Sequence, residues 1–244
     1  MAYLLKAHTK MTPGANGGTT SAIDTTGADI LFIVASRYGL GSEAFPPSDN
    51  KGNTWQNCNQ YQSTSPADAT MRIWYAKNAI VGSGHTFTYS ASSCYPQIDI
   101  LAFSGSLTSS DPVDQQNGAA GTGFNVSTLQ TGSVTPSQAN ELLVTGMSIN
   151  SNAPGVVPTI DSGFTVSDAD GFGSGNNMGG GAAYLIQTAA AAVNPTWSLG
   201  IATANPAAAI ATFKAVAAPT GKLFRPAPLT GLGVGGPFFS NPGG

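Results

Sequence analysis

The sequence predicts an all-β protein: an antiparallel β-sandwich of the jelly-roll or lectin-like kind, with an internal repeat and an irregular C-terminal arm. Short runs rich in β-branched and aromatic residues recur along the 244 residues, and Gly, Pro, Asn, Asp or Ser bound each run. The only helix-like stretch, residues 188–193, is an alanine-rich run too short to stand alone, so we read it as a connection. Two long segments also match each other at a nearly constant spacing. Short strands joined by polar turns are typical of an antiparallel sandwich.

The first half of the chain carries two kinds of strand signal. Residues 85–89 alternate polar and apolar side chains, as a strand with one buried face does. Residues 30–34 are continuously apolar, which suits a strand covered on both faces. The strands expected in this half are residues 3–9, 30–36, 53–57, 71–77, 85–90 and 97–104.

The second half repeats the first. Three aromatic pairs match at a separation of 110 residues: Trp74 with Tyr184, Phe87 with Trp197, and Phe103 with Phe213. Residues 29–35 match residues 141–147 at a separation of 112 residues, and residues 53–55 match residues 163–165 more loosely. Because the separation changes by only two residues, from 110 to 112, we interpret the two segments as one structural unit used twice. The strands expected here are residues 124–130, 142–149, 164–167, 182–187, 196–199 and 208–214.

Two domain arrangements fit this repeat. Each half could form its own small sandwich, or the halves could interleave into one larger sandwich. We expect the second, with residues 1–218 as one body built from halves at about 20–105 and 135–215, because no Pro- or Gly-rich linker separates them. Residues 105–124 then form a surface excursion.

A different segment follows the body. Residues 219–244 are rich in glycine and proline, which argues against regular structure. The segment is nevertheless too apolar for a solvated linker, so we expect it to be an arm that orders against another surface, on its own chain or on a neighbour. The docking residues expected in the arm are Leu223, Phe224, Leu229, Leu232, Phe238 and Phe239.

Composition narrows the classes of partner. Charged residues make up 9% of the chain and the formal net charge is −3, so clustered cations for nucleic acid are not expected. No apolar run approaches the length of a membrane span, and residues 1–10 do not resemble a signal peptide. We therefore expect no nucleic-acid and no membrane partner, and a protein made in a host cytoplasm; an extracellular or cell-surface protein is the alternative.

Residues that could carry chemistry are few. His8 and His85 are both interpreted as surface or rim histidines rather than catalytic ones, and Glu141 as marking entry into a strand. Nucleophile motifs are absent, and two histidines and two cysteines without close spacing do not suggest a zinc site. We predict no catalytic residues, no metal and no cofactor.

Cysteines and tyrosines leave alternatives open. Cys58 and Cys94 flank one half of the repeat and could form a disulfide or remain free thiols. The aromatic residues shared by both halves are interpreted as core residues rather than as a sugar platform. The residues at loop edges that better suit a platform for a glycan are Tyr38, Tyr61 and Tyr95.

Four phrases of the first half point to a known kind of module. They are residues 48–55 (SDNKGNTW), 73–78 (IWYAKN), 82–88 (GSGHTFT) and 100–105 (ILAFSG). In this order they resemble a β-sandwich module of uncharacterised bacterial and bacteriophage surface and virion proteins, and the resemblance covers roughly residues 20–215. It implies a non-enzymatic surface or virion component, with no catalytic residues to carry over.

The function expected from the sequence is therefore that of a structural protein of a bacteriophage virion: a capsid decoration, head-fibre or tail-associated protein. Its partners would be other virion proteins and copies of itself in a homo-oligomer, assembled through the arm and sheet surfaces. A carbohydrate-binding or adhesive surface module is the alternative, with a glycan as its ligand. A hydrolase with a site assembled from loops is a third reading.

Overall fold

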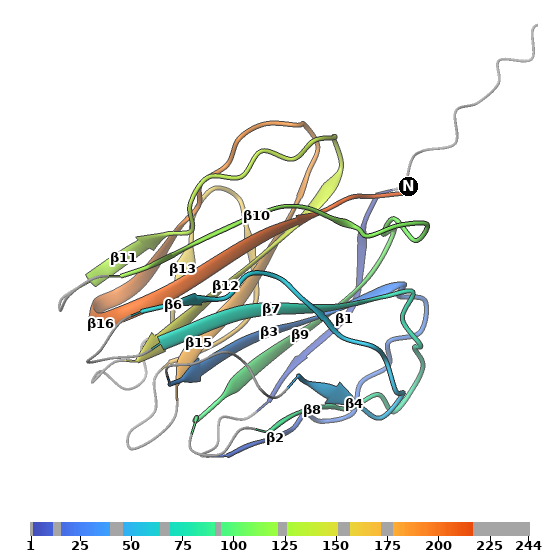
Figure 1. Ribbon diagram of the computed structural model, residues 1–244, viewed down its shortest axis with the longest axis horizontal. Coiled ribbons are helices and arrows are strands. Elements are labelled where there is room, and N and C mark those ends of the chain that lie inside the picture. Colours follow the sequence, from blue (N-terminus) through green and yellow to red (C-terminus); the bar gives the residue numbers. More distant parts are fainter. Residues whose placement is uncertain are drawn as a thin grey trace, which may run out of the picture.

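The computed structural model shows the all-β sandwich that the sequence predicts, with antiparallel sheets stacked in layers (Figure 1). It describes residues 2–11, 16–39, 46–63, 69–90, 94–121, 126–150, 157–171 and 178–216. The arm that the sequence predicts at residues 219–244, with its docking residues, lies outside the described residues. Within the described part of the chain, no helix is long and apolar enough to cross a membrane.

Each half of the chain forms one main sheet with the same strand order. The first main sheet runs β1 (Leu4–Lys10), β9 (Gln97–Ser104), β3 (Ile30–Tyr38), β7 (Ala69–Lys77) and β5 (Gln56–Asn57), with β6 (Tyr61–Gln62) also on β7. The second runs β10 (Val113–Ala120), β16 (Thr196–Phe213), β12 (Glu141–Asn150), β15 (Gly179–Gln187) and β14 (Thr165–Asp170). Each strand of the first sheet has a counterpart at the same place in the second sheet. The repeat in the sequence is therefore also a repeat of the strand order.

Each half also carries a small outer sheet. In the first half it contains β2 (Gly17–Thr19), β8 (Phe87–Ser90) and β4 (Ser48–Asp49). In the second half β11 (Val126–Gln130) and β13 (Thr159–Ile160) pair with the first part of β16, which then continues into the main sheet as one long strand (Figure 1). The connection expected at residues 188–193 is confirmed, since it contains neither a helix nor a strand.

The halves do not interleave as expected. Among the described strands, those up to Ser104 and those from Val113 onward form separate sheets. Residues 113–120, expected in a surface excursion, instead form the edge strand β10 on β16. The reason is that each half supplies a complete set of hydrogen-bonding partners for its own strands, so no exchange of strands is needed. What the halves share is the core between their main sheets.

The shared core shows that the halves are related by an approximate two-fold rotation. Tyr75 packs edge-on against Phe213 at 5.6 Å between ring centroids, and Tyr184 packs in the same way against Phe103 at 5.1 Å. Such a reciprocal exchange of contacts is the property of an isologous interface. Ser36 donates a hydrogen bond to Ser148 at 2.7 Å, and these two residues are 112 positions apart, so each meets its own counterpart near the rotation axis.

One part of the sequence alignment is wrong by a single residue. Strand registers place Phe32 opposite Tyr75 and Val144 opposite Tyr184. Phe32 and Val144 are counterparts at the separation of 112 residues, so the counterpart of Tyr184 is Tyr75 rather than Trp74. Trp74 packs instead in the outer core of its own half. The reason is that neighbouring residues of a strand point to opposite faces, so a shift of one position moves a side chain from one core to the other.

Candidate functional site

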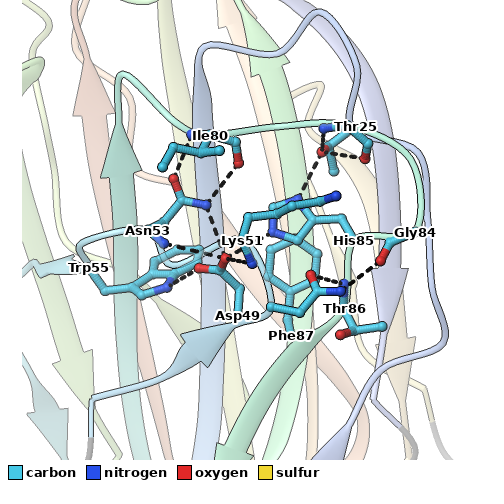
Figure 2. Close-up of polar contacts among 12 residues, drawn as sticks. Thr25, Asp49, Lys51, Asn53, Trp55, Ile80, Gly84, His85, Thr86 and Phe87 are labelled. Atoms are coloured by element: carbon cyan, nitrogen blue, oxygen red, sulfur yellow. Dashed lines mark hydrogen bonds and ion pairs between the residues drawn. The ribbon is translucent and has the colours of Figure 1, made fainter.

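The phrase SDNKGNTW folds into a tight loop around the carboxylate of Asp49, shown in Figure 2. Asp49 ends β4, and the chain turns back through Gly52, whose φ of +80° is a left-handed conformation that favours glycine. The Asp49 Oδ1 atom accepts hydrogen bonds from the backbone N–H of Lys51 at 2.8 Å and from the Asn53 side-chain amide at 3.1 Å. An aspartate that hydrogen-bonds its own backbone two residues later is a common turn device.

The same carboxylate also binds side chains from outside the turn. Trp55 donates its indole N–H to Oδ2 at 2.8 Å, and the His85 Nε2 atom lies 3.2 Å from Oδ1. Burial of Asp49 raises its pKa, but the hydrogen bonds from Lys51, Trp55, His85 and Asn53 outweigh this effect and hold the pKa below its usual value. Asp49 is therefore an ionised carboxylate that organises the loop.

His85 is buried, which corrects the expectation of a surface or rim histidine. Its side chain is 0% exposed, stacks on Phe87 at 4.3 Å and has its Nδ1 atom 2.9 Å from the Thr25 hydroxyl. Burial lowers the pKa of His85, and the hydrogen bond with Asp49 offsets this only in part. The alternation that brings Phe87 and Tyr89 into the core contains the missed signal, since it places His85 on the same face.

Asp49, His85 and Thr25 form a row of acid, imidazole and hydroxyl, an order that activates nucleophiles in acyl-transfer enzymes. Here all three side chains are buried, and the Thr25 hydroxyl oxygen accepts from the N–H of Gly82 and lies 3.2 Å from the Gly82 carbonyl oxygen. The row therefore connects three loops of the first half. Asn53 strengthens the same connection, because its amide exchanges hydrogen bonds with the backbone of Ile80 (Figure 2).

The second polar cluster lies at a seam between the halves, where strand β1 runs beside β14. His8 pairs with Asp168 at 2.8 Å and Lys10 pairs with Asp170 at 2.6 Å, with the basic residues from the first half and the acids from the second. His8 is thus partly exposed at an edge, as expected. Asp99, fully buried beside them, has a pKa raised well above its usual value by burial and by the charges of Asp168 and Asp170.

Strand entry is marked by an acid in both halves, as the sequence suggests for Glu141. Glu141 is buried at the first position of β12. Its counterpart Asp29 precedes β3 and accepts hydrogen bonds from the backbone N–H groups of Gly105 and Ser106 at 2.8 and 3.1 Å.

The cysteines and the three tyrosines serve packing. Cys58 and Cys94 form no disulfide: both are thiols, and Cys58 is buried in the core between the main sheets. The three tyrosines proposed as a glycan platform are each half-buried and packed against that same core: Tyr38, Tyr61 and Tyr95. Where the structure describes the chain, no group of three or more His, Cys, Asp or Glu side chains is placed to hold a metal ion.

Comparisons of the chain with models of protein families, with curated proteins and with solved structures found no match. The functional reading therefore depends on the residues themselves.

Proposed function

We propose that this chain is a non-enzymatic structural protein of a bacteriophage virion: a capsid decoration, head-fibre or tail-associated protein. Its folded body, residues 1–218, would present an inert surface, and its arm, residues 219–244, would dock on other virion proteins or on copies of itself. The proposal places the protein in the particle after synthesis in the host cytoplasm.

A structural role is supported by the burial and the hydrogen bonding of the Asp49–His85–Thr25 row. These are the groups of the first half best suited to acid–base chemistry, and all three side chains are buried and hydrogen-bonded to backbone or to one another. Two of the phrases that resemble the phage module, residues 48–55 and 82–88, build this loop, so that part of the resemblance is explained by folding requirements. A body stabilised in this way suits a component that persists outside a cell.

The arm supplies the assembly part of the proposal. Its sequence combines glycine and proline with large apolar side chains, and charged residues make up only 9% of the whole chain. A weakly charged body gives little electrostatic steering, so affinity would come from apolar burial by the arm and from repetition of the contact around a particle. The carbohydrate-binding alternative gains no support from Tyr38, Tyr61 and Tyr95, because their rings pack against the central core.

Mass spectrometry of purified particles tests the proposal directly. We expect the chain among the virion proteins at a fixed copy number, and its absence from particles would overturn the proposal. Deletion of residues 219–244 should leave a folded body with an unchanged far-ultraviolet spectrum and should remove the protein from particles. Full occupancy by the truncated chain would refute docking by the arm.

A matched pair of variants separates the apolar contact from chain length. Replacing both Phe238 and Phe239 by serine should reduce occupancy strongly, since each exchange removes a large apolar side chain. Replacing Ser240 and Asn241 by alanine in the same segment should have little effect. Equal occupancy for the two variants would argue against apolar docking.

A further inference from the structure

The second half contains a lysine and an aspartate in contact beside a buried glutamate. Lys214 follows the last residue of β16, and Asp114 lies on the neighbouring edge strand β10. The Lys214 Nζ atom is 2.9 Å from Asp114 Oδ1. The Asp114 side chain is only 6% exposed, so most of the surrounding water is excluded from its carboxyl carbon.

Glu141 is the third member of this group. It is 0% exposed, and its Oε1 atom accepts hydrogen bonds from Gln138 N at 3.2 Å and Ser137 Oγ at 3.4 Å. Ser137 also donates its backbone N–H to Asp114 Oδ2 at 2.7 Å, so one residue contacts both carboxyl groups. Burial raises the pKa of Glu141; a hydrogen bond with Thr212 opposes this, the charge of Asp114 adds to it, and the net direction is upward.

We propose that Lys214 and Asp114 form an intramolecular amide bond, with Glu141 as the proton carrier. The pair starts as an ammonium and a carboxylate. Burial raises the pKa of Asp114, but the hydrogen bonds from Lys214 and Ser137 outweigh it and lower that pKa, and the hydrogen bond with Asp114 raises the pKa of Lys214. A proton passes from Nζ to the Asp114 carboxyl group, and the neutral amine attacks the carboxyl carbon. The new Nζ–Cγ bond replaces one Cγ–O bond, one water molecule leaves, and Glu141 gives up and regains one proton. No oxidation or reduction occurs.

The geometry supplies what this condensation needs. The amine touches one oxygen of the carboxyl group, and the carbon under attack is one covalent bond from that oxygen. Holding two reacting groups within about 3–3.5 Å is equivalent to an effective concentration of about 10⁵ M or more. A buried acid that can donate a proton to the departing oxygen adds general acid catalysis. The bond would also tie the edge strand β10 to the end of β16, where the described chain ends two residues later.

Two other places in the molecule serve as comparisons. In the first half, Ser104 stands 110 positions before Lys214, so the counterpart site holds no amine. At the seam, Lys10 is even closer to its partner Asp170, at 2.6 Å, but the Asp170 side chain is 26% exposed. Proximity alone therefore does not distinguish Lys214; the burial of Asp114 and the adjacent buried Glu141 do.

The intact mass of the purified protein, incubated for hours at neutral pH, tests the proposal. We expect the wild-type mass to be lower than the sequence mass by one water molecule. A tryptic digest should then contain a branched peptide joining the segments around residues 114 and 214, with no cleavage after Lys214. A wild-type mass equal to the sequence mass, before and after incubation, would overturn the proposal.

Single substitutions identify which side chains form the bond and which one carries the proton. Lys214→Arg keeps the charge but cannot form the amide, and Asp114→Ala lacks the carboxyl group, so both should retain the full mass. Glu141→Gln keeps the shape of the side chain and should slow formation of the linked species about 100-fold or more, because the proton carrier is lost. Lys10→Arg, the matched control, should lose water like the wild type. Loss of water from Lys214→Arg, or an unchanged rate in a folded Glu141→Gln variant, would contradict the assignment.

Discussion

The two halves of the chain share one strand order but hold their outer sheets in place differently. In the first half the buried carboxylate of Asp49 collects donors from its own loop, from Trp55 and from His85. In the second half the outer core centres on Trp197, whose indole N–H donates to the Thr145 hydroxyl at 3.1 Å. Duplication has preserved the pairing of strands, whereas the polar groups that fix the loops differ. Of the motif phrases, residues 48–55 and 82–88 build this loop, whereas residues 73–78 and 100–105 lie in or directly after the strands β7 and β9.

The sharpest test of this difference is to remove one aspartate from each half. Asp49→Ala should lower the free energy of unfolding by about 3–5 kcal/mol, because several donors, including buried Trp55 and His85 nitrogens, lose their acceptor. Asp161→Ala should cost about 1 kcal/mol, since Asp161 is exposed and its two donors, the Thr196 N–H and the Ser162 hydroxyl, can bind water instead. Urea denaturation of both variants measures the two values. Equal losses would show that the halves do not differ in this way.

The core between the halves offers a second test, at a position where the two halves carry side chains of different size. Val34 and Gly146 are counterparts across the rotation axis, and a Cβ atom on Gly146 would lie 2.3 Å from Val34 Cγ1 and 2.7 Å from Met71 Sδ. Gly146→Ala should therefore destabilise the protein by about 1–3 kcal/mol through overpacking. Adding Val34→Ala should recover part of this loss, and thermal unfolding of the single and double variants measures the coupling. Strict additivity would argue against direct contact.

The dependence of stability on pH should reveal two buried groups of the first half, His85 and Asp99, that act in opposite directions. The folded pKa of His85 is lowered by burial, so the neutral ring is favoured in the native state and its contribution is present above the unfolded value of 6.5. That contribution is lost as the pH falls below this value toward the folded pKa. Asp99 has the opposite sign, because its raised pKa favours the protonated form and its contribution grows on acidification.

Comparing the wild type with His85→Gln isolates the histidine, because Asp99 is present in both. Urea denaturation between about pH 7 and pH 4 should show a steeper acid-side loss for the wild type than for the variant. Asp161→Ala, as a control in the other half, should keep the wild-type slope. Parallel curves for the wild type and His85→Gln would contradict a buried neutral histidine.

The smallest effect is expected at the seam to which the halves contribute opposite charges. Lys10→Met removes a partly exposed ion pair with Asp170, which should cost about 0.5 kcal/mol and less at high salt. Urea denaturation at low and high ionic strength measures both values. A loss that salt does not reduce would mean that the Lys10 side chain acts by packing rather than by charge.

Much of the fold could be predicted from the sequence because strand signals and turn residues are local. The runs at residues 30–36 and 71–77 correspond to β3 and β7, and the repeat gave the correct alignment of Phe103 with Phe213 on β9 and β16. The layering could not be predicted in the same way, because which sheet a strand joins depends on hydrogen bonds between distant segments. The strand β10 was missed since Gly118 and its polar neighbours lack the β-branched pattern.

The site was less accessible to sequence reasoning. His85 was misplaced on the surface because histidine is common there, although its alternation with Phe87 carried the right answer. The partners of Asp49 come from its own loop and, in the case of His85, from a segment 36 positions away that only the fold brings close. Contacts such as Lys214 with Asp114, one hundred positions apart, leave no local pattern at all.

The rotation axis between Ser36 and Ser148 has a consequence for the protein at high concentration. Because every copy of the chain carries the same pair of surfaces, the first half of one molecule fits the second half of any other as well as it fits its own. A molecule that opened between residues 104 and 113 could close again with a neighbour and regain every contact it had lost. Exchanged dimers of this kind would be indistinguishable from the closed form by their core packing, and would differ only in size.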